Sequence, residues 1–455
     1  VVPIEHSINK QPMNDMILQC TGSRLLALYA VGQKQICDLN NFLESQKQQI
    51  YDMGFYFRSD IGSGWLFGMN DSSETNETND SKISLYSKAG VNIETKNKAI
   101  KSIHSYAKET HHEYVIDNEG GFGGLIRLPC LPRANFQNTK NDSWVIVNST
   151  DSVGSKSLFV RKWWGLEKGM KSLGHDIVNH CVNDILVQSP YVRPWTFMDY
   201  YATHHLDPRE LRAFVEGVSE ACKKVQCALI GGETAEIPGL YREGASDLVG
   251  AITGIVYESQ LLRPRETICE GDLVFGLPSE SPHTNGYTLI QKLIKDAEND
   301  IQTNDKKEVE NRERNKSMYL RYVDEWCKPH KCYMEEVKML VENGIEIKGL
   351  CHITGGGFKD NPPRIIDTER YEFKFDYDVI VNEMPPWMKY LYDAVLEAGS
   401  TANEVFQTFN CGYGMLVVVD VKYRDKLSKI FCEKKQGKFI GEIVAKSSED
   451  DLFDL

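Results

Sequence analysis

Short apolar, β-branched runs alternate with helical patterns through the middle of the chain. The runs predict buried strands over 144–149, 227–232 and 247–257. Apolar residues at helical spacing predict helices over 175–188 and 208–225, and a late run predicts one more strand over 414–421. Alternating strands and helices indicate an α/β (or α+β) fold, in which ligands bind at the carboxyl ends of strands.

Composition divides the chain into four parts, 1–68, 69–82, 83–260 and 261–455. The first contains an amphipathic helical pattern and then an aromatic-rich stretch. The second, MNDSSETNETNDSK, is polar and acidic and cannot bury apolar area, so it predicts a flexible linker. The last contains a charge-rich insert at 295–317, which is typical of a solvated loop or helix face, and we assign no site to it.

The first acidic cluster, TDSVGSK, follows the first predicted strand. Asp151 is expected to project from the strand end, and Lys156 is close enough to neutralise a bound anion. The small residues between them let backbone amides approach that anion: Ser152, Gly154 and Ser155. For a lone Asp-Ser pair, an Asx turn that joins two elements is the simpler interpretation, so this cluster depends on its companions.

The second cluster lies in the predicted helix over 175–188, whose apolar residues share one face. Asp184 comes four residues after His180, so the two side chains are neighbours across one helical turn. Asn183 and Asp184 at the helix end offer the hard oxygen ligands that Mg²⁺ prefers. The alternative is an ordinary solvated helix face.

The third cluster, GGETAEIPG, follows the apolar run CALI. Gly231 and Gly232 are expected to let the backbone turn tightly after this strand. Glu233, Thr234 and the weaker candidate Glu236 are then expected at the strand's carboxyl end, beside Asp151. Each cluster alone is a weak signal, but the three together predict a site for a metal ion and a polyphosphate.

Charge and cysteine usage exclude several classes of protein. The formal charge of −13 argues against nucleic acid as the main partner, since phosphate backbones are bound by clustered Lys and Arg. The 12 cysteines form no C-x-x-C pair, which indicates reduced thiols in a cytoplasmic protein. The longest apolar stretch near the amino end, LLALYAV, is too short to span a bilayer, so we expect no membrane association.

Several motifs, in a fixed order, resemble those of the phosphoribosylformylglycinamidine cyclo-ligase (AIR synthetase) family. The resemblance begins near Tyr86 and covers most of the chain. It rests on the three acidic clusters and on these further motifs: YSKAGVNIETKN, GGFGGL, LPCLP, DYYAT, PHTNGY, HITGGGF, NPPR and FNCGYGM. The motif GGETAE-x-PG is the most specific among them.

The resemblance implies a fold and a reaction. It implies two α/β domains of the AIR-synthetase-like (PurM-like) fold over 83–260 and 261–455, with the first domains of two subunits paired in a homodimer. It also implies ATP-dependent cyclisation of formylglycinamidine ribonucleotide to aminoimidazole ribonucleotide, with release of ADP and phosphate. The substrate supplies the nucleophile, so the protein's share is positioning, Mg²⁺ binding and charge stabilisation.

The same resemblance assigns roles to residues. It implies Mg²⁺ binding by Asp151, Asp184 and Glu233, and catalytic roles for Asp184, His283, His352 and Lys156, with Lys156 facing phosphate. Residues expected to line the nucleotide and substrate come from the Gly-rich segment, the acidic clusters and the second domain: Gly120, Gly121, Gly123, Gly124, Asp151, Ser152, Gly154, Ser155, Asn183, Gly231, Gly232, Glu233, Thr234, Asn285, Thr354, Gly355, Gly356 and Gly357.

Some residues depart from the family pattern. Ser152 and Ser155 replace a Gly and a Thr, and both are small enough to keep the phosphate cradle. His330 and Lys331 stand where the family reads Thr and Arg, and His104 stands where related enzymes often carry Lys. Residues 157–173, which include two adjacent tryptophans, also depart from the pattern.

Two alternatives follow from these departures. One is a nucleotide-binding scaffold without turnover, acting through the first 68 residues, which are expected either to contact another purine-pathway enzyme transiently or to extend the dimer. The other is a different ATP-using relative such as a selenophosphate synthetase, which is disfavoured because no reactive Cys stands beside the Gly-rich segment before Gly124.

Overall fold

The computed structural model describes residues 142–298, 317, 319–434 and 437–446, together with five short strands before them. The chain divides into two compact units, Val1–Lys82 and Ile83–Leu455. The first unit contains a three-stranded antiparallel sheet in the order β1-β3-β2, formed by β1 (Ala27–Leu28), β2 (Phe55–Arg58) and β3 (Trp65–Met69). The amphipathic helix and the polar linker predicted in this part of the chain lie outside the described residues.

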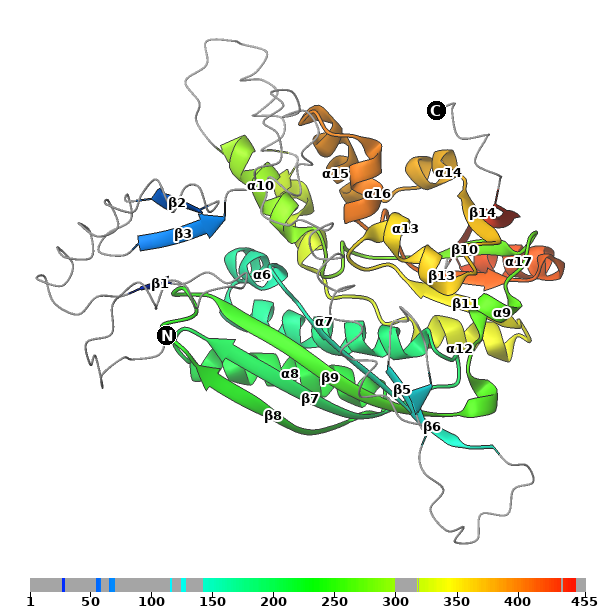
Figure 1. The fold of residues 1–455 in the computed structure, drawn as a ribbon, viewed down its shortest axis with the longest axis horizontal. Coiled ribbons are helices and arrows are strands. Elements are labelled where there is room, and N and C mark those ends of the chain that lie inside the picture. The colour runs from blue at the N-terminus through cyan, green and yellow to red at the C-terminus, as the bar shows by residue number, and fades with distance from the viewer. Residues whose placement is uncertain are drawn as a thin grey trace, which may run out of the picture. The chain divides into compact units, whose positions relative to one another are not determined.

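The first sheet of the second unit has six strands in the order β4-β5-β6-β9-β7-β8. Its strands are β4 (Val115–Ile116), β5 (Gly124–Arg127), β6 (Trp144–Ser152), β7 (Arg193–Thr203), β8 (Ala228–Glu236) and β9 (Ser246–Tyr257). Only β7 and β8 pair in parallel. Helices α6 (Lys156–Trp164) and α7 (Leu166–Leu186) connect β6 to β7, and α8 (Pro208–Lys224) connects β7 to β8. Helices α7 and α8 pack on one face of the sheet (Figure 1).

The second sheet is antiparallel throughout, in the order β11-β13-β10-β14-β12. Its strands are β10 (Leu273–Pro278), β11 (Ile347–His352), β12 (Tyr371–Phe375), β13 (Tyr413–Val419) and β14 (Lys438–Ala445). Every residue of β13 is buried, because it is flanked by two strands and covered on both faces.

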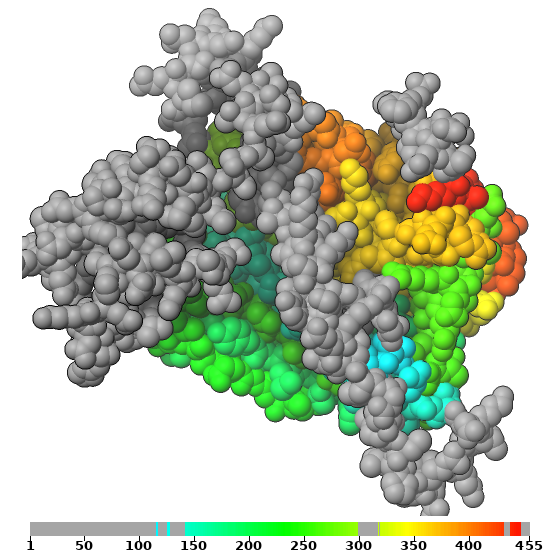
Figure 2. Space-filling view, in the orientation of Figure 1, coloured from blue at the N-terminus to red at the C-terminus, as the bar shows by residue number. Residues whose placement is uncertain are grey.

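The second sheet consists of β10, in green, and four strands from the yellow to red end of the chain (Figures 1 and 2). Helices of this half pack on this sheet, on α7 or on one another. They are α9 (Pro264–Thr267), α10 (Tyr287–Glu298), α12 (Met334–Glu342), α13 (Gly357–Asp360), α14 (Tyr377–Asn382), α15 (Pro386–Glu397), α16 (Ala402–Thr408) and α17 (Arg424–Lys434). Short 3-10 turns occur at Glu258–Gln260, Pro362–Ile365 and Val421–Tyr423.

The two sheets meet through α7 and through an aromatic cluster. Phe159 of α6 packs 5.4 Å from Tyr287 and 6.3 Å from Trp326, measured between ring centroids. Trp326 and Tyr287 are both fully buried, so this cluster belongs to one core that both halves share. The interface is therefore part apolar, near α6 and α10, and part polar, along α7.

The mixed α/β architecture expected from the alternating pattern is confirmed, as is the type of each predicted element that lies within the described residues. The expectation of a tight turn at Gly231–Gly232 is wrong, because β8 runs through both glycines to Glu236 as an extended partner of β7. Helix α7 begins at Leu166, well before the predicted start. Strand β7 and helix α6 were not among the predicted elements.

Candidate active site

The polar face of α7 is buried against the C-terminal half of the chain. Asp176, His180, Asn183 and Asp184 expose at most 4% of their surface. The alternative of a solvated helix face is therefore wrong. Burying four polar side chains is unfavourable unless each has a partner, so their contacts show what this face does.

His180 lies between two carboxylates. Its Nε2 atom is 3.0 Å from Oδ2 of Asp151 and 3.9 Å from Oδ2 of Asp184, one helical turn away. On the other side of the ring, Nδ1 is 2.9 Å from the hydroxyl of Thr284. Two acceptors around one buried imidazole favour its charged form.

Charge and burial oppose each other at this site. Burial alone would lower the pKa of His180, but the charges of Asp151 and Asp184 outweigh it and raise the pKa to about 9. Burial would likewise raise the pKa of Asp151, but His180 lowers it to about 2. At neutral pH the centre is an imidazolium held by carboxylates.

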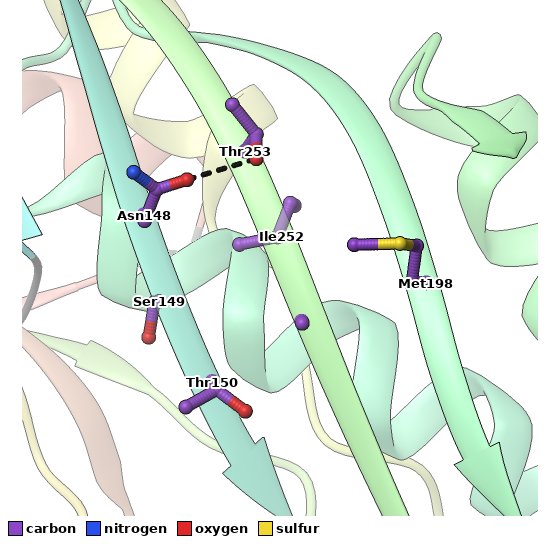
Figure 3. A pocket seen from close by; sticks show the side chains of 7 residues that line it. Asn148, Ser149, Thr150, Met198, Ile252 and Thr253 are labelled. Carbon is purple, nitrogen blue, oxygen red and sulfur yellow. Dashed lines mark hydrogen bonds between the residues drawn. The ribbon is translucent and has the colours of Figure 1, made fainter. Parts of the chain in front are cut away.

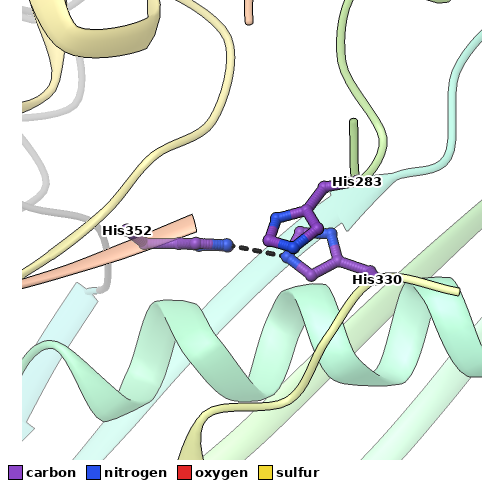
Figure 4. Close-up of side chains that lie close together, drawn as sticks. All are labelled: His283, His330 and His352. Atoms are coloured by element: carbon purple, nitrogen blue, oxygen red, sulfur yellow. Dashed lines mark hydrogen bonds between the residues drawn. The ribbon is translucent and has the colours of Figure 1, made fainter. Parts of the chain in front are cut away.

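Asp184 joins this centre to a second histidine. Its Oδ1 atom is 2.8 Å from Nδ1 of His352, and its Oδ2 atom accepts a hydrogen bond from Ser149 at 3.0 Å. Nε2 of His352 is 2.8 Å from Nε2 of His330, whose ring stacks on that of His283 with centroids 3.8 Å apart (Figure 4). Four histidines from α7, β11 and two loops thus converge.

Lys156 is fully buried. Its Nζ atom donates to Oδ1 of Asp176 at 2.7 Å and to the carbonyl of Lys328 at 2.7 Å. The same Oδ1 atom accepts the backbone N–H of His330 at 2.7 Å. Burial lowers the pKa of Lys156 and raises that of Asp176, and their mutual attraction opposes both shifts. The expected contact of Lys156 with phosphate stays a prediction, and it requires this pair to separate.

Asn183 holds the same loop, which carries His330 and Lys331. Its amide donates to the carbonyl of Lys331 at 2.7 Å and accepts the N–H of Tyr333 at 3.0 Å. Asn179 donates to the carbonyl of His330 at 2.6 Å. The side chain of Asn183 is thus engaged with the loop, and its expected role at the nucleotide stays a prediction.

The residues after Asp151 turn toward α10. The N–H of Ser152 donates to Oδ1 of Asp151 at 2.6 Å. An Asx turn would instead use the N–H of Val153, which donates to the carbonyl of Leu248, so the Asx-turn alternative is wrong. Gly154 has φ 54°, and the hydroxyl of Ser155 is 3.0 Å from that of Thr288. This segment therefore bridges the two halves beside the carboxylate of Asp151.

The third acidic cluster, on β8, lies apart from Asp151 and α7 in the fold. Strands β9 and β7 separate β8 from β6, so the expectation that Glu233 stands beside Asp151 is wrong within one chain. Asp151 pairs with Gly250 and faces α7, whereas Glu233 pairs with Tyr200 on the exposed edge strand. The carboxylate of Glu233 accepts the N–H of Thr234 at 2.8 Å. Within one chain, Glu233 therefore takes no part in the site around Asp151.

The glycine-rich motif of the second domain is held by Asn361. Its amide donates to the carbonyls of Thr354 at 3.2 Å and Gly357 at 2.9 Å. A Cβ atom at Gly357, where φ is 56°, would lie 2.0 Å from the carbonyl oxygen of Phe406, so only glycine fits. Asn285 lies next to this segment, since a Cβ at Gly355 would be 3.1 Å from its Oδ1.

Sequence reasoning missed three participants: Asp176, Thr284 and Ser149. A signal existed for Asp176, because Asp176, His180 and Asp184 recur every four residues and so share one helix face. Thr284 and Ser149 had no such signal, since each meets α7 only through tertiary packing. Gly124 starts β5, while His104 and the glycines at 120, 121 and 123 lie outside the described residues.

The face of the six-stranded sheet that α7 and α8 leave uncovered is concave. A depression of about 410 Å³ is lined by Asn148, Ser149, Thr150, Met198, Ala251, Ile252 and Thr253 (Figure 3). Across it, Thr253 donates to Oδ1 of Asn148 at 2.8 Å. Large apolar side chains surround it, with Trp144, Tyr257 and Met198 exposing 37%, 38% and 47% of their surface.

Comparison with known proteins found matches over most of the chain. Residues 134–256 match the family described as AIR synthase related protein, N-terminal domain, and residues 270–451 match AIR synthase related protein, C-terminal domain. A thiamine-monophosphate kinase from Stenotrophomonas maltophilia K279a, a solved structure, is 15% identical with a TM-score of 0.47 over 75% of this chain and 92% of its own. In the part of the chain that the structure describes, no helix is long and apolar enough to cross a bilayer.

Several curated relatives are more similar in sequence. A phosphoribosylformylglycinamidine cyclo-ligase of Clostridium perfringens (strain 13 / Type A) is 34% identical over 359 residues, 79% of this chain and 95% of the relative. That of Lawsonia intracellularis (strain PHE/MN1-00) is 37% identical over 73% of this chain and 86% of its own. That of Prochlorococcus marinus (strain MIT 9215) is 34% identical over 80% and 96%.

The two matched domains define an AIR synthase related protein. Within that class, the chain belongs to the phosphoribosylformylglycinamidine cyclo-ligase family. The resemblance drawn from the motifs is thereby confirmed.

Proposed function

We propose that this protein is a ligase that converts formylglycinamidine ribonucleotide to aminoimidazole ribonucleotide, using ATP and releasing ADP and phosphate. Family membership over most of the chain carries this proposal. The intact convergence of Asp151, His180 and Asp184 supports it, because the chain retains a charged, partly enclosed centre for phosphate chemistry.

The reaction needs activation of an amide oxygen, which is a poor leaving group. The γ-phosphoryl of ATP moves to the formyl oxygen, the amidine nitrogen of the substrate attacks the formyl carbon, and the oxygen leaves as phosphate. Nucleophile and electrophile belong to one molecule, so the protein contributes orientation and charge stabilisation. His283 and His352 remain our candidates for contact with the reacting atoms.

The residues present fit a Mg²⁺ ion. The carboxylates of Asp151 and Asp184 both face Nε2 of His180. The two carboxylates attract the positive charge of this ring and would attract a metal cation in the same way. Mg²⁺ usually binds one or two protein carboxylates and completes its shell with water and phosphate oxygens. Bound there, Mg²⁺ neutralises phosphate charge. Glu233 joins this set only if a second subunit supplies it.

A homodimer is the assembly we propose. The uncovered sheet face carries Trp144, Met198 and Tyr257. Seven of the nine residues of the edge strand β8 are exposed, and among the described residues only β7 pairs with this strand. Exposed apolar faces and free edges are the features that a second copy covers. We place the reaction in the cytoplasm, because the eight described cysteines are free thiols.

The test is ADP release by the purified protein with Mg-ATP, with and without formylglycinamidine ribonucleotide. We expect release that depends on the substrate, and a fall of about 10²–10³-fold in Asp184→Asn, which loses one of the two carboxylates. Glu216→Gln is the matched control, because this carboxylate is exposed on α8 and pairs with Lys171. Nucleotide binding without any release of ADP would favour the scaffold alternative and refute the proposal.

A further inference from the structure

Three histidine rings converge within the C-terminal half, next to the carboxylate site but apart from it. His283 follows β10, His330 precedes α12 and His352 ends β11, and none of the three exposes any surface. One ring nitrogen from each can be chosen so that all three lie within 4.8 Å of one another. Figure 4 shows His283 stacked on His330, with His352 pointing at His330.

His283 is buried without a partner for its polar atoms. Among the described residues, neither of its ring nitrogens has a hydrogen-bond partner, and Nδ1 of His330 has none either. A buried imidazole N–H or lone pair without a partner is unfavourable, and native structures rarely leave one unless an ion, a water or a ligand completes it. The ring nitrogens of His283 therefore point to an occupant.

The backbone around His283 is arranged to hold the ring in this place. His283 has φ 63°, a left-handed conformation that residues other than glycine rarely adopt. Gly414 makes room for it, since a Cβ there would lie 2.1 Å from Cε1 of the ring. Strained conformations of this kind persist where the surrounding structure enforces them, and they gather at binding sites.

Asp184 orients His352 as a carboxylate orients a metal-binding imidazole. Nδ1 of His352 faces Oδ1 of Asp184 at 2.8 Å, so the proton of a neutral ring is held there. Its Nε2 atom then carries a lone pair, which faces Nε2 of His330 at 2.8 Å. A metal ion in this position replaces the proton that the two nitrogens otherwise share.

We propose that His283, His330 and His352 bind one divalent ion of the Zn²⁺ class, at a site separate from the Mg²⁺ position between Asp151 and Asp184. Imidazole nitrogens suit Zn²⁺, Co²⁺, Ni²⁺ and Cu²⁺, whereas Mg²⁺ prefers oxygen. Three histidines with a water in the fourth position form a common zinc site, with Zn–N distances of about 2.0–2.1 Å. Binding turns the ring of His283 out of its stack, so that one nitrogen faces the ion.

The test measures metal binding directly, on full-length protein without a polyhistidine tag. The protein is stripped with chelator and titrated with Zn²⁺ in excess Mg²⁺, and bound zinc is counted with a chromogenic chelator. The visible absorption of bound Co²⁺ reports the geometry. The variants are His330→Thr and His283→Gln. The control is His175→Gln, because His175 lies on α7 with its ring 3.1 Å from Glu220.

We expect one zinc per chain in the wild type and in His175→Gln, and the loss of stoichiometric binding in both cluster variants. Absence of bound zinc in the wild type would overturn the proposal and leave water as the occupant. Binding that survives both substitutions would also overturn it, by locating the ion elsewhere. If one cluster variant fails to fold, judged by circular dichroism, the other decides. None of these readouts depends on cyclisation.

Discussion

The polar face of α7 and the edge strand β8 carry similar residues but have different surroundings. Asp176 and Asp184 on α7 are buried and contact side chains from distant parts of the chain. Glu233 and Glu236 on β8 are exposed: Glu233 accepts the N–H of Thr234, and Glu236 lies 3.0 Å from the ring of His205. Both regions looked alike in the sequence, as acidic residues next to strands or helices.

The difference lies in what covers each region. The C-terminal half covers α7 and removes water from its carboxylates, so each charge acts strongly on its neighbours. Burial lowers the pKa of His180, but the charges of Asp151 and Asp184 outweigh it and raise the pKa to about 9. Nothing among the described residues covers β8 in the same way, and its carboxylates remain solvated. The charges of an acidic cluster therefore act strongly on one another only where another element encloses it.

The largest expected effect is on the buried ion pair of α7. Asp176→Asn leaves the ammonium of Lys156 buried without its counter-charge, and we expect the free energy of unfolding to fall by about 3–5 kcal/mol. Denaturant unfolding measures it. Glu236→Gln, on β8, is the matched change, and we expect no measurable loss there. Equal effects of the two substitutions would contradict the comparison.

The second effect concerns the pH dependence of stability through His180. Its folded pKa of about 9 lies above the ordinary value of 6.5, so its contribution is fully present below pH 6.5 and is lost as pH rises through 9. That contribution is about 3 kcal/mol at most. The free energy of unfolding of the wild type should therefore fall between pH 6.5 and pH 9, and that of His180→Gln should change less over the same range.

A matched histidine on the exposed side serves as the control for that slope. His205 lies beside Glu236 with 68% of its side chain exposed. We expect His205→Gln to keep the pH slope of the wild type, since a solvated ring contributes little to folding. A flattened slope in His205→Gln, or an unchanged slope in His180→Gln, would show that other groups set the pH dependence.

The fold could be predicted where local pattern decides it. Apolar periodicity identified α7, α8, β6 and β9, because each has one face in the core. Strand β7 was missed, since its sequence, RPWTFMDYYAT, has a proline at its second position and mixes exposed aromatic residues with buried ones. The glycines in β8 suggested a turn, yet pairing with β7 keeps them extended. Tertiary pairing overrode local preference there.

Some residues of the candidate site were predicted, but not the contacts between them. Asp151, Asp184 and His352 were named from motifs, and the structure brings them together. The hydrogen bonds from α7 to the loop at His330 join residues about 150 positions apart in the sequence. The periodicity of a single sequence carries no information on such distant contacts. For the same reason Glu233 was predicted beside Asp151, although β9 and β7 lie between β6, which carries Asp151, and β8, which carries Glu233.

A smaller effect should appear on the uncovered sheet face. Met198→Lys places a charge in the proposed dimer interface, and we expect the free energy of dimerisation to fall by about 2 kcal/mol, or roughly thirtyfold in Kd. Light scattering over a dilution series measures the mass. Leu320→Lys is the control, because this leucine is similarly exposed, at 51%, outside that sheet. A wild type that is monomeric at all concentrations would refute the dimer.

The smallest expected effect concerns a single hydrogen bond between His180 of α7 and the C-terminal half that covers it. Thr284→Val removes the hydroxyl 2.9 Å from Nδ1 of His180, and we expect a loss of about 1 kcal/mol in unfolding free energy at neutral pH, together with a lower pKa of His180. Thr284→Ser should restore both, because it keeps the hydroxyl. Thr234→Val on exposed β8 should change neither. NMR titration of the His180 ring measures the pKa, and an unshifted value in Thr284→Val would mean that the carboxylates alone hold the charge.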